Sequence, residues 1–552
     1  MTKKIQVFLN PMLNWKTIVT SHYKIHYIGD CNDEKNNIND FNNLAKTIRK
    51  NENPFFLKKY FCNINGHYSI IYQDNKKVFA LVDWIRAFPI FYAKVNKKVF
   101  FSNCPKLLKT KTNISKLDYS AALDIASSGY ATGRRTLFKH IKQIQPGQFL
   151  YDKKNQLNIE TYNSYYPKSI TSSSIKYNSI KKKFIEALDE VFSKLVEKSK
   201  DRNIFIPLSA GYDSRLILSC LLRHGHKKIS CYSYGLKNNS EMQIAKAICN
   251  RLNIPIKLIN TSPRIIRNYS KTNHFKKFLY FADNFCSTPF VQDLPALSLF
   301  LQKNKLSADT IFINGNTGDF ISGGHIPEGF KSNISLKKGL NKLISTFAAK
   351  HFSLWDRVTQ DPYKSIIENR IKKLVELKLE KNNFNNIVDL YESLEWEERQ
   401  SKFVVTGQRV YDFLGYDWRL PLWELPIKVF FENLSFVDKF EQNFYKKVLY
   451  DLNWSNIWRE FPLNSKKVYP IWVRPIRYFL QGLHLPLGKN KWHKFEKKYF
   501  EYWTSYISTY ALVPFFDTLK YDDSFRSVVS LRTARYLENF GLDRFGGKEF
   551  TN

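Results

Sequence analysis

The chain has 552 residues, enough for two domains, and a formal net charge of +37 at pH 7. Hydrophobic residues make up 43% of it and aromatic residues 16%, so packed cores are expected and a mostly disordered protein is excluded. No apolar stretch approaches the length of a membrane-spanning helix, and the N-terminus lacks the pattern of an export signal. Seven cysteines without a CxxC pair indicate reduced thiols, which predicts a cytoplasmic protein.

The positive charge has several interpretations. Lys and Arg are spread along the whole chain, and Lys, Asn and Ile are abundant together, so general solubility with compositional drift is one of them. Peripheral contact with an anionic membrane is another, since a basic face gains roughly 1 kcal/mol per Lys or Arg near anionic lipid. A nucleic-acid partner is the third. The sequence indicates no oligomeric state.

The first part of the chain, to about residue 165, has the pattern of β-strands with interspersed helices. A stretch rich in Ser, Thr, Tyr and Pro from Ser164 to Ser174 then predicts an interdomain linker. The predicted strands are 65–72, 78–83, 88–92 and 99–102, followed by a helix over 119–128.

Beyond the linker, apolar residues recur with helical period from Ile180 to Val196. Short apolar runs then alternate with helical patterns, which is typical of a parallel α/β sheet. From about residue 335 onward the pattern is helical throughout. The predicted strands are 204–208, 229–234, 254–259 and 310–313, with a helix over 240–252 between the second and the third.

The turn after the first of these strands is the most informative segment. Small and hydroxyl residues precede a helix over 216–222, which predicts a strand, a phosphate-binding turn and a helix. The backbone N–H groups of the turn, the Ser209 and Ser214 hydroxyls and the helix dipole would favour an anion such as pyrophosphate. Asp213 is placed to hold the magnesium that accompanies such an anion. The alternative is a small polar turn that binds nothing.

A second loop, Asn314-Gly315-Asn316-Thr317-Gly318-Asp319, follows the last predicted strand. Ligands collect at the carboxyl ends of the strands of an open parallel sheet. We therefore expect this loop and the turn at Ser209 to face the same crevice.

Together these segments resemble class B asparagine synthetases and their relatives, the β-lactam synthetases, over nearly the whole chain. The turn at Ser209 resembles the Ser-Gly-Gly-x-Asp-Ser loop of the ATP pyrophosphatases. Other segments also resemble motifs of this family. They are 65–68, 83–86 and 89–92 in the first domain, and 315–325, 419–424 and 446–450 in the second.

The resemblance implies an α/β protein of two domains. Residues 1–165 would form a class II glutamine amidotransferase-like domain, which is an Ntn-hydrolase-like α+β sandwich. Residues 175–552 would form an ATP pyrophosphatase domain with a parallel sheet and a helical C-terminal extension.

The reaction that the resemblance implies is adenylation of a carboxylate by ATP, followed by displacement of AMP by ammonia or an amine. Asp213 and Asp319 would bind Mg²⁺, and Lys446, or Lys447 if the register shifts by one, would stabilise the leaving pyrophosphate. The alternative for Lys446 is a solvated helix lysine. The nucleotide would be held by Leu208, Ser209, Ala210, Gly211, Asp213, Ser214, Tyr234 and Gly315.

Several positions depart from the family pattern. Thr2 stands at the place of the N-terminal cysteine nucleophile, so we expect no glutaminase activity and a nitrogen supply from free ammonia, a separate protein or an amine substrate. Asn316 replaces an acidic residue of the family. His325, at the position of a family tyrosine, is a candidate for proton transfer, with a buried structural histidine as the alternative. Ala210 and Tyr212 replace Gly and Leu in the first loop.

The leading hypothesis is therefore an ATP-dependent carbon–nitrogen ligase that acts on small molecules. Surface polysaccharide assembly, in which a uronic acid or amino sugar is modified, is one setting for it. A tRNA-modifying ATP pyrophosphatase is a rival, against which the amidotransferase-like domain counts. A non-catalytic nucleotide-binding relative is the third hypothesis.

Overall fold

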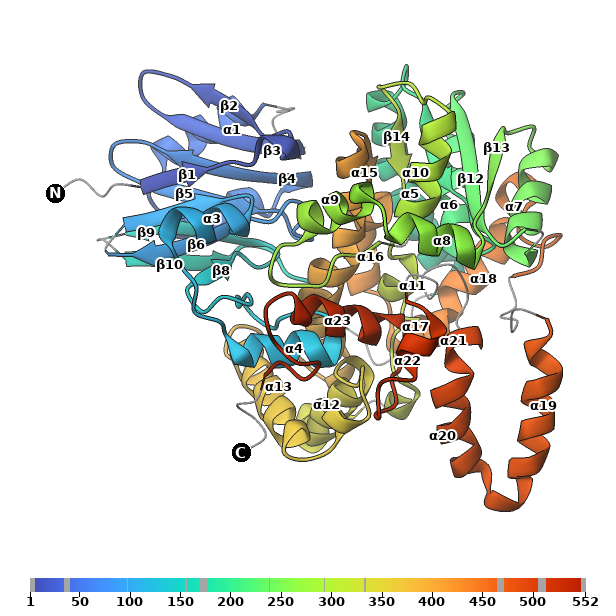
Figure 1. The fold of residues 1–552 in the computed structure, drawn as a ribbon. Helices are drawn as coiled ribbons and strands as arrows, with labels where there is room; N and C mark the ends of the chain where they lie inside the picture. The colour runs from blue at the N-terminus through green and yellow to red at the C-terminus, as the bar shows by residue number, and fades with distance from the viewer. Residues whose placement is uncertain are drawn as a thin grey trace.

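A computed structural model describes residues 5–33, 40–96, 98–153, 156–168, 176–237, 239–291, 293–331, 334–463, 471–504 and 513–547 (Figure 1). Helices and strands are mixed, and one sheet is entirely parallel, which confirms the predicted α/β class. None of the described helices combines the length and apolar character that crossing a membrane requires. All seven cysteines are free and six of them are buried, as predicted for reduced thiols.

Two sheets pack face to face in the first part of the chain (Figure 1). Their facing sides share a core to which the six-stranded sheet gives Ile71 and Ala80 and the four-stranded sheet gives Val99 and Phe101. The six-stranded sheet runs β10-β9-β5-β4-β3-β2 and the four-stranded sheet β1-β7-β6-β8. Their strands are β1 (Ile5–Phe8), β2 (Lys16–Val19), β3 (Lys24–Asp33), β4 (Ile64–Gln73), β5 (Val78–Val82), β6 (Phe91–Val95), β7 (Lys98–Ser102), β8 (Ile141–Gln143), β9 (Gln148–Lys153) and β10 (Gln156–Thr161).

Helices cover the outer faces of this sandwich. The six-stranded sheet packs on α1 (Phe41–Lys50) and α2 (Pro54–Phe61). The four-stranded sheet packs on α3 (Pro105–Thr112) and α4 (Tyr119–Ser128). Most predicted elements lie where expected, but β6 begins three residues later than predicted. The segment before it contains Pro89, which lacks an N–H for the sheet.

The parallel sheet has the strand order β13-β12-β11-β14-β15. The chain builds outward from β11 to β13 and then returns to the other side of β11, so the order reverses between β11 and β14. Such a reversal leaves a crevice at the carboxyl ends of the two strands. β15 corrects the prediction of helices alone after residue 335, because a three-residue edge strand is too short to show a period. The strands are β11 (Ile204–Pro207), β12 (Ile229–Gly235), β13 (Ile256–Asn260), β14 (Ile311–Ile313) and β15 (Asp417–Arg419).

Helices surround this sheet and extend beyond it (Figure 1). A second helical core joins segments that are far apart in sequence, including α23 near the C-terminus. The helices next to the sheet are α5 (Tyr177–Lys198), α6 (Tyr212–Arg223), α7 (Ser240–Arg251), α8 (Pro263–Ser270), α9 (Asn273–Ala282), α10 (Leu294–Lys303), α15 (Arg409–Leu414), α16 (Leu425–Glu432) and α18 (Asn443–Leu452). The second core contains α12 (Leu336–His351), α13 (Tyr363–Leu379), α14 (Ile387–Glu395) and α23 (Val528–Glu538), and a π-helix (Trp396–Val404) follows α14.

Candidate active site

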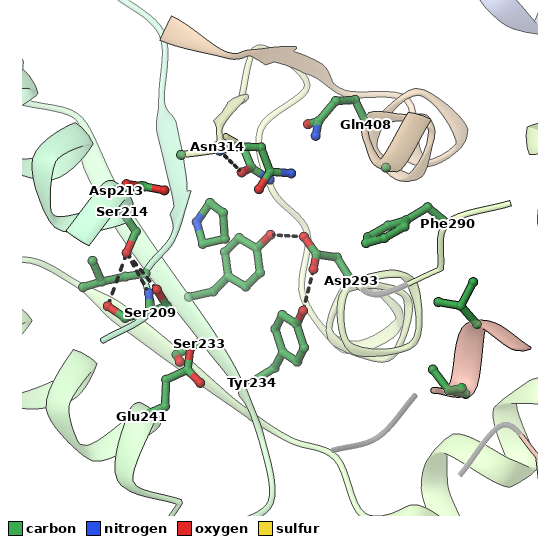
Figure 2. Close-up of a pocket in the computed structure, with 18 of the residues that line it drawn as sticks. Ser209, Asp213, Ser214, Ser233, Tyr234, Glu241, Phe290, Asp293, Asn314 and Gln408 are labelled. Carbon is green, nitrogen blue, oxygen red and sulfur yellow. Dashed lines mark hydrogen bonds between the residues drawn. The ribbon is translucent and has the colours of Figure 1, made fainter. Parts of the chain in front are cut away.

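A cavity of about 470 Å³ opens at the carboxyl ends of β11, β12 and β14 (Figure 2). This volume lies within the usual range for small-molecule sites. Both predicted loops contribute to the lining, as expected from the strand order. Six of the predicted nucleotide-binding residues therefore share one cavity: Leu208, Ser209, Asp213, Ser214, Tyr234 and Gly315. Ala210 and Gly211 belong to the same loop but do not line the cavity.

The turn after β11 is organised by two serines. The Ser209 and Ser214 hydroxyl oxygens lie 3.0 Å apart, and the Ser209 N–H donates to the Ser214 hydroxyl at 3.1 Å. The Gly211 N–H donates to the Ser209 hydroxyl at 3.1 Å, immediately before α6 begins. The loop thus presents two hydroxyls and the positive end of a twelve-residue helix to the cavity.

The loop after β14 packs directly onto the start of α6. A Cβ atom at Gly318 would lie 2.4 Å from Oδ1 of Asp213, and one at Gly315 would lie 2.9 Å from the Asp213 Cβ. Only glycine permits this approach at either position. The Asp319 N–H then donates to Oδ2 of Asp213 at 3.0 Å, which joins the two loops.

Asp213 is the central acidic group of the site. The Tyr445 hydroxyl donates to its Oδ1 at 2.9 Å. Burial raises the pKa of Asp213 to about 7 and the neighbouring Asp319 carboxylate adds to the rise, although the Tyr445 and Asp319 hydrogen bonds oppose it. A cation that binds beside this carboxyl group would stabilise its ionised form.

Asp319 connects this centre to a buried ionic network. His325 Nε2 lies 3.1 Å from Oδ2 of Asp319, and His325 Nδ1 contacts Oε1 of the fully buried Glu395. The Asp319 side chain is half-exposed, and its partial burial would raise its pKa. Hydrogen bonds from His325, Thr317 and the Phe320 N–H outweigh this effect and lower the pKa of Asp319 to about 2. Burial would likewise lower the pKa of His325, yet the two carboxylates raise it to about 9. His325 is therefore an imidazolium at neutral pH, with both ring nitrogens as donors.

This imidazolium predicts a pH dependence of stability. The pKa of His325 is about 9 in the folded protein and about 6.5 when unfolded, so its contribution is complete below pH 6.5 and is lost as pH rises through 9. We expect His325→Gln to remove a fall in unfolding free energy of up to about 3 kcal/mol between pH 7 and 9.5. Denaturant titrations at several pH values measure this, with the exposed His140→Gln as control. Identical pH profiles for H325Q and the wild type would contradict the assignment.

An ordered cluster of tyrosines forms another wall of the cavity. The Tyr234 hydroxyl donates to Oδ1 of Asp293 at 2.5 Å (Figure 2). The Tyr411 and Tyr232 hydroxyls donate to Oδ2 of Asp293 at 2.8 and 3.2 Å. Asp293 was not predicted from the sequence, because it stands outside every recognisable motif. Its fixed carboxylate is a hydrogen-bond acceptor suited to a hydroxyl or amino group of a ligand.

The cavity also contains a cation that the sequence analysis missed. Arg532 of α23 is the one lysine or arginine among the described residues that line it. Within the described part of the chain, the Arg532 guanidinium has neither a hydrogen bond nor an ion pair, and burial lowers its pKa to about 10. An unpaired guanidinium in a cavity costs free energy that an anionic ligand would recover.

The two predicted lysines lie beside the cavity and not in its wall. Lys446 and Lys447 are on α18, next to the Tyr445 that contacts Asp213. The Lys447 ammonium lies over the Tyr177 ring, 4.2 Å from its centre. Thr2 and residues 169–174 of the predicted linker lie outside the described residues.

Asp213 and Asp319 are the carboxylates that would hold magnesium. Two carboxylates together with substrate phosphates are a common donor set for this ion. The described residues contain no group of three or more His, Cys, Asp or Glu side chains that could bind a metal by itself. The donor set therefore fits a magnesium ion that arrives with the nucleotide and takes its other ligands from phosphates and water.

Comparison with known proteins gives a family match over the segment that contains most of the cavity lining. Residues 187–449 match the sequence model of the asparagine synthase family. This segment contains both loops, the tyrosine cluster, His325 and Lys446, and it ends before Arg532. No curated protein matches the chain.

Solved structures align with parts of the chain at low identity. Glutamine phosphoribosylpyrophosphate amidotransferase from B. subtilis, complexed with ADP and GMP, covers 56% of this chain and 59% of its own at 9% identity, with a TM-score of 0.19. NMN synthetase from Francisella tularensis covers 27% and 59% at 19% identity (TM-score 0.18). Glutamine-dependent NAD+ synthetase from Acinetobacter baumannii, in complex with ADP, covers 48% and 61% at 10% identity (TM-score 0.18). The chain thus spans about three fifths of the length of these proteins, and the TM-scores are too low for further argument.

Proposed function

We propose that this protein is an ATP-dependent ligase that adenylates a small-molecule carboxylate and transfers the acyl group to ammonia or an amine. One observation carries the proposal: the Ser209 and Gly315 loops meet at the reversal of the parallel sheet, where the Asp319 N–H binds Asp213. The asparagine synthase match over this segment supports the same reaction class.

In the proposed reaction, an oxygen of the substrate carboxylate attacks the α-phosphorus of ATP and pyrophosphate leaves. The Ser209 and Ser214 hydroxyls and the N-terminus of α6 would receive the pyrophosphate. Magnesium held by Asp213 and Asp319 would neutralise the developing charge. The imidazolium of His325 would keep Asp319 ionised and oriented, as its lowered pKa indicates.

The acyl substrate would lie toward α23, with its own negative charge near Arg532. The ribbon of α23 lies across the cavity from the Ser209 loop, and that loop would receive the pyrophosphate (Figure 2). Arg532 is therefore better placed for an anionic group of the substrate than Lys446, which remains our candidate for a phosphate contact from α18. A uronic acid of surface polysaccharide assembly that carries a second anionic group, in addition to the carboxylate that reacts, fits these requirements.

Arg532→Gln tests this placement. We expect KM for the acyl substrate to rise about tenfold to a hundredfold, with little change in kcat or in ATP affinity, because one charged hydrogen bond is lost. Thermal stability should stay the same or rise, since an unpaired cation is removed. Arg535→Gln, on the same helix but paired with Asp517 outside the cavity, is the control. Equal effects of R532Q on KM for ATP and for the carboxylate would overturn the placement.

We propose ammonia or an amine, and not glutamine, as the nitrogen donor. The sandwich of residues 1–165 would then be an amidotransferase-like scaffold in a cytoplasmic enzyme. The proposal is tested by magnesium-dependent release of AMP and pyrophosphate from ATP, across a panel of carboxylates with ammonia, amines or glutamine. Release that depends on one carboxylate supports it, and the absence of release with every member of the panel opposes it.

A further inference from the structure

A helical hairpin projects from the body of the protein at residues 471–500 (Figure 1). It consists of α19 (Val473–His484), a short turn (Leu485–Leu487) and α20 (Lys489–Tyr499). The two helices pack through a small core of their own, in which Val473, Trp492 and Phe500 are buried. The side chains between the two helices are thus buried without any contribution from the outer face of the hairpin.

The outer face of α19 is apolar and open to solvent. Trp472, Ile476, Phe479 and Leu483 follow one another at spacings of four, three and four residues, so they form one stripe along the helix. The stripe continues to the tip at 485–487, and exposures along it run from 46% to 76%. Of the 21 exposed large hydrophobic side chains among the described residues, nine lie between 471 and 499. Single exposed apolar residues are ordinary, but a continuous face marks a binding surface.

The same segment is strongly basic. Between residues 471 and 500 there are seven lysines and arginines and one acidic residue, Glu496. Glu496 is paired with Arg477, so it does not offset the remaining cations. Lys489 and Lys491 are exposed immediately after the apolar tip. The partner of this surface must therefore be both apolar and anionic.

We propose that the hairpin docks on an anionic lipid bilayer, with the apolar stripe and tip of α19 in the interface and the lysines of α20 against the headgroups. An apolar stripe rich in Trp, Phe and Leu beside lysines is the pattern of helices that lie in a membrane interface. Nucleic acid would use the cations but not the apolar face. The net charge of +37 would add long-range attraction to the same surface.

Sedimentation with sucrose-loaded vesicles tests the proposal on the full-length protein. We expect binding to vesicles of 30% phosphatidylserine in phosphatidylcholine, and much weaker binding to phosphatidylcholine alone or in 0.5 M salt. Phe479→Glu with Leu485→Glu should lower the partition coefficient more than roughly tenfold. Lys489→Gln with Lys491→Gln should lower it roughly tenfold on anionic vesicles, and not at all on neutral ones.

The matched control is Val19→Glu with Phe55→Glu, which changes two side chains of similar exposure in β2 and α2 of the sandwich. The sandwich lies far from the hairpin (Figure 1). This pair should bind vesicles like the wild type, and thermal denaturation should show all variants folded. No binding of the wild type to anionic vesicles would overturn the proposal. Dimers that the Phe479→Glu and Leu485→Glu pair dissociates, without vesicle binding by the wild type, would instead assign the face to a second copy of the chain.

Discussion

Asp213→Asn is expected to lower magnesium-dependent formation of AMP and pyrophosphate by roughly a hundredfold or more. Asparagine keeps the shape of the side chain but cannot supply an anionic ligand to magnesium. An asparagine side chain also accepts hydrogen bonds at only one atom, whereas the two oxygens of Asp213 accept from the Tyr445 hydroxyl and the Asp319 N–H. Steady-state release of pyrophosphate measures the loss.

The stability of the same variant separates a functional role from a structural one. Burial and the Asp319 carboxylate raise the pKa of Asp213 to about 7, so its ionised form is costly at pH 8. D213N should therefore unfold at the same temperature as the wild type, or at a higher one. The exposed Asp201→Asn is the matched control and should change neither quantity. Full turnover in D213N would exclude adenylation at this site.

Gly318→Ala is expected to have the second large effect, a loss of activity of roughly a hundredfold. The new Cβ would lie 2.4 Å from Oδ1 of Asp213 and 2.8 Å from Cδ1 of Leu422, so the loop after β14 must move away from α6. The hydrogen bond that joins Asp319 to Asp213 would then be lost. The expected cost in stability is about 1–3 kcal/mol.

Gly482→Ala is the control for this prediction. A Cβ at Gly482, in α19, would meet no atom within 4 Å, and alanine favours helix. Activity assays and thermal denaturation of both variants give the comparison. Retention of full activity in G318A would show that the contact between the two loops is not required.

The local parts of the site were predictable from the sequence. The strand before Ser209 is a short apolar run followed at once by small residues, so β11 could be placed closely. The same is true of β14 and the loop that follows it. The helix after β11 begins at Tyr212 and not at residue 216 as predicted, because Asp213 and Ser214 in its first turn are polar and do not show the apolar period. Because carboxyl ends of neighbouring parallel strands share one edge, the meeting of the two loops also followed.

The parts of the site that the sequence left open depend on long-range packing. Arg532 belongs to a helix more than 300 residues beyond Ser209, and nothing in its own segment indicates that this helix returns to the cavity. Glu395 is 70 residues from His325. Burial by itself would lower the pKa of His325, but the carboxylates of Glu395 and Asp319 raise it to about 9. Proton transfer was one expectation for His325; the structure places its ring between Asp319 and Glu395, and the expectation stays a prediction.

Transfer of oxygen from the substrate tests adenylation most directly. A carboxylate labelled with ¹⁸O, incubated with ATP, Mg²⁺ and the nitrogen donor, is expected to leave one labelled oxygen in the phosphate of AMP, because attack on the α-phosphorus is followed by cleavage of the acyl carbon–oxygen bond. Wild type should show this label, and D213N should form little labelled AMP. Labelled inorganic phosphate together with ADP, or unlabelled AMP, would contradict the proposed reaction.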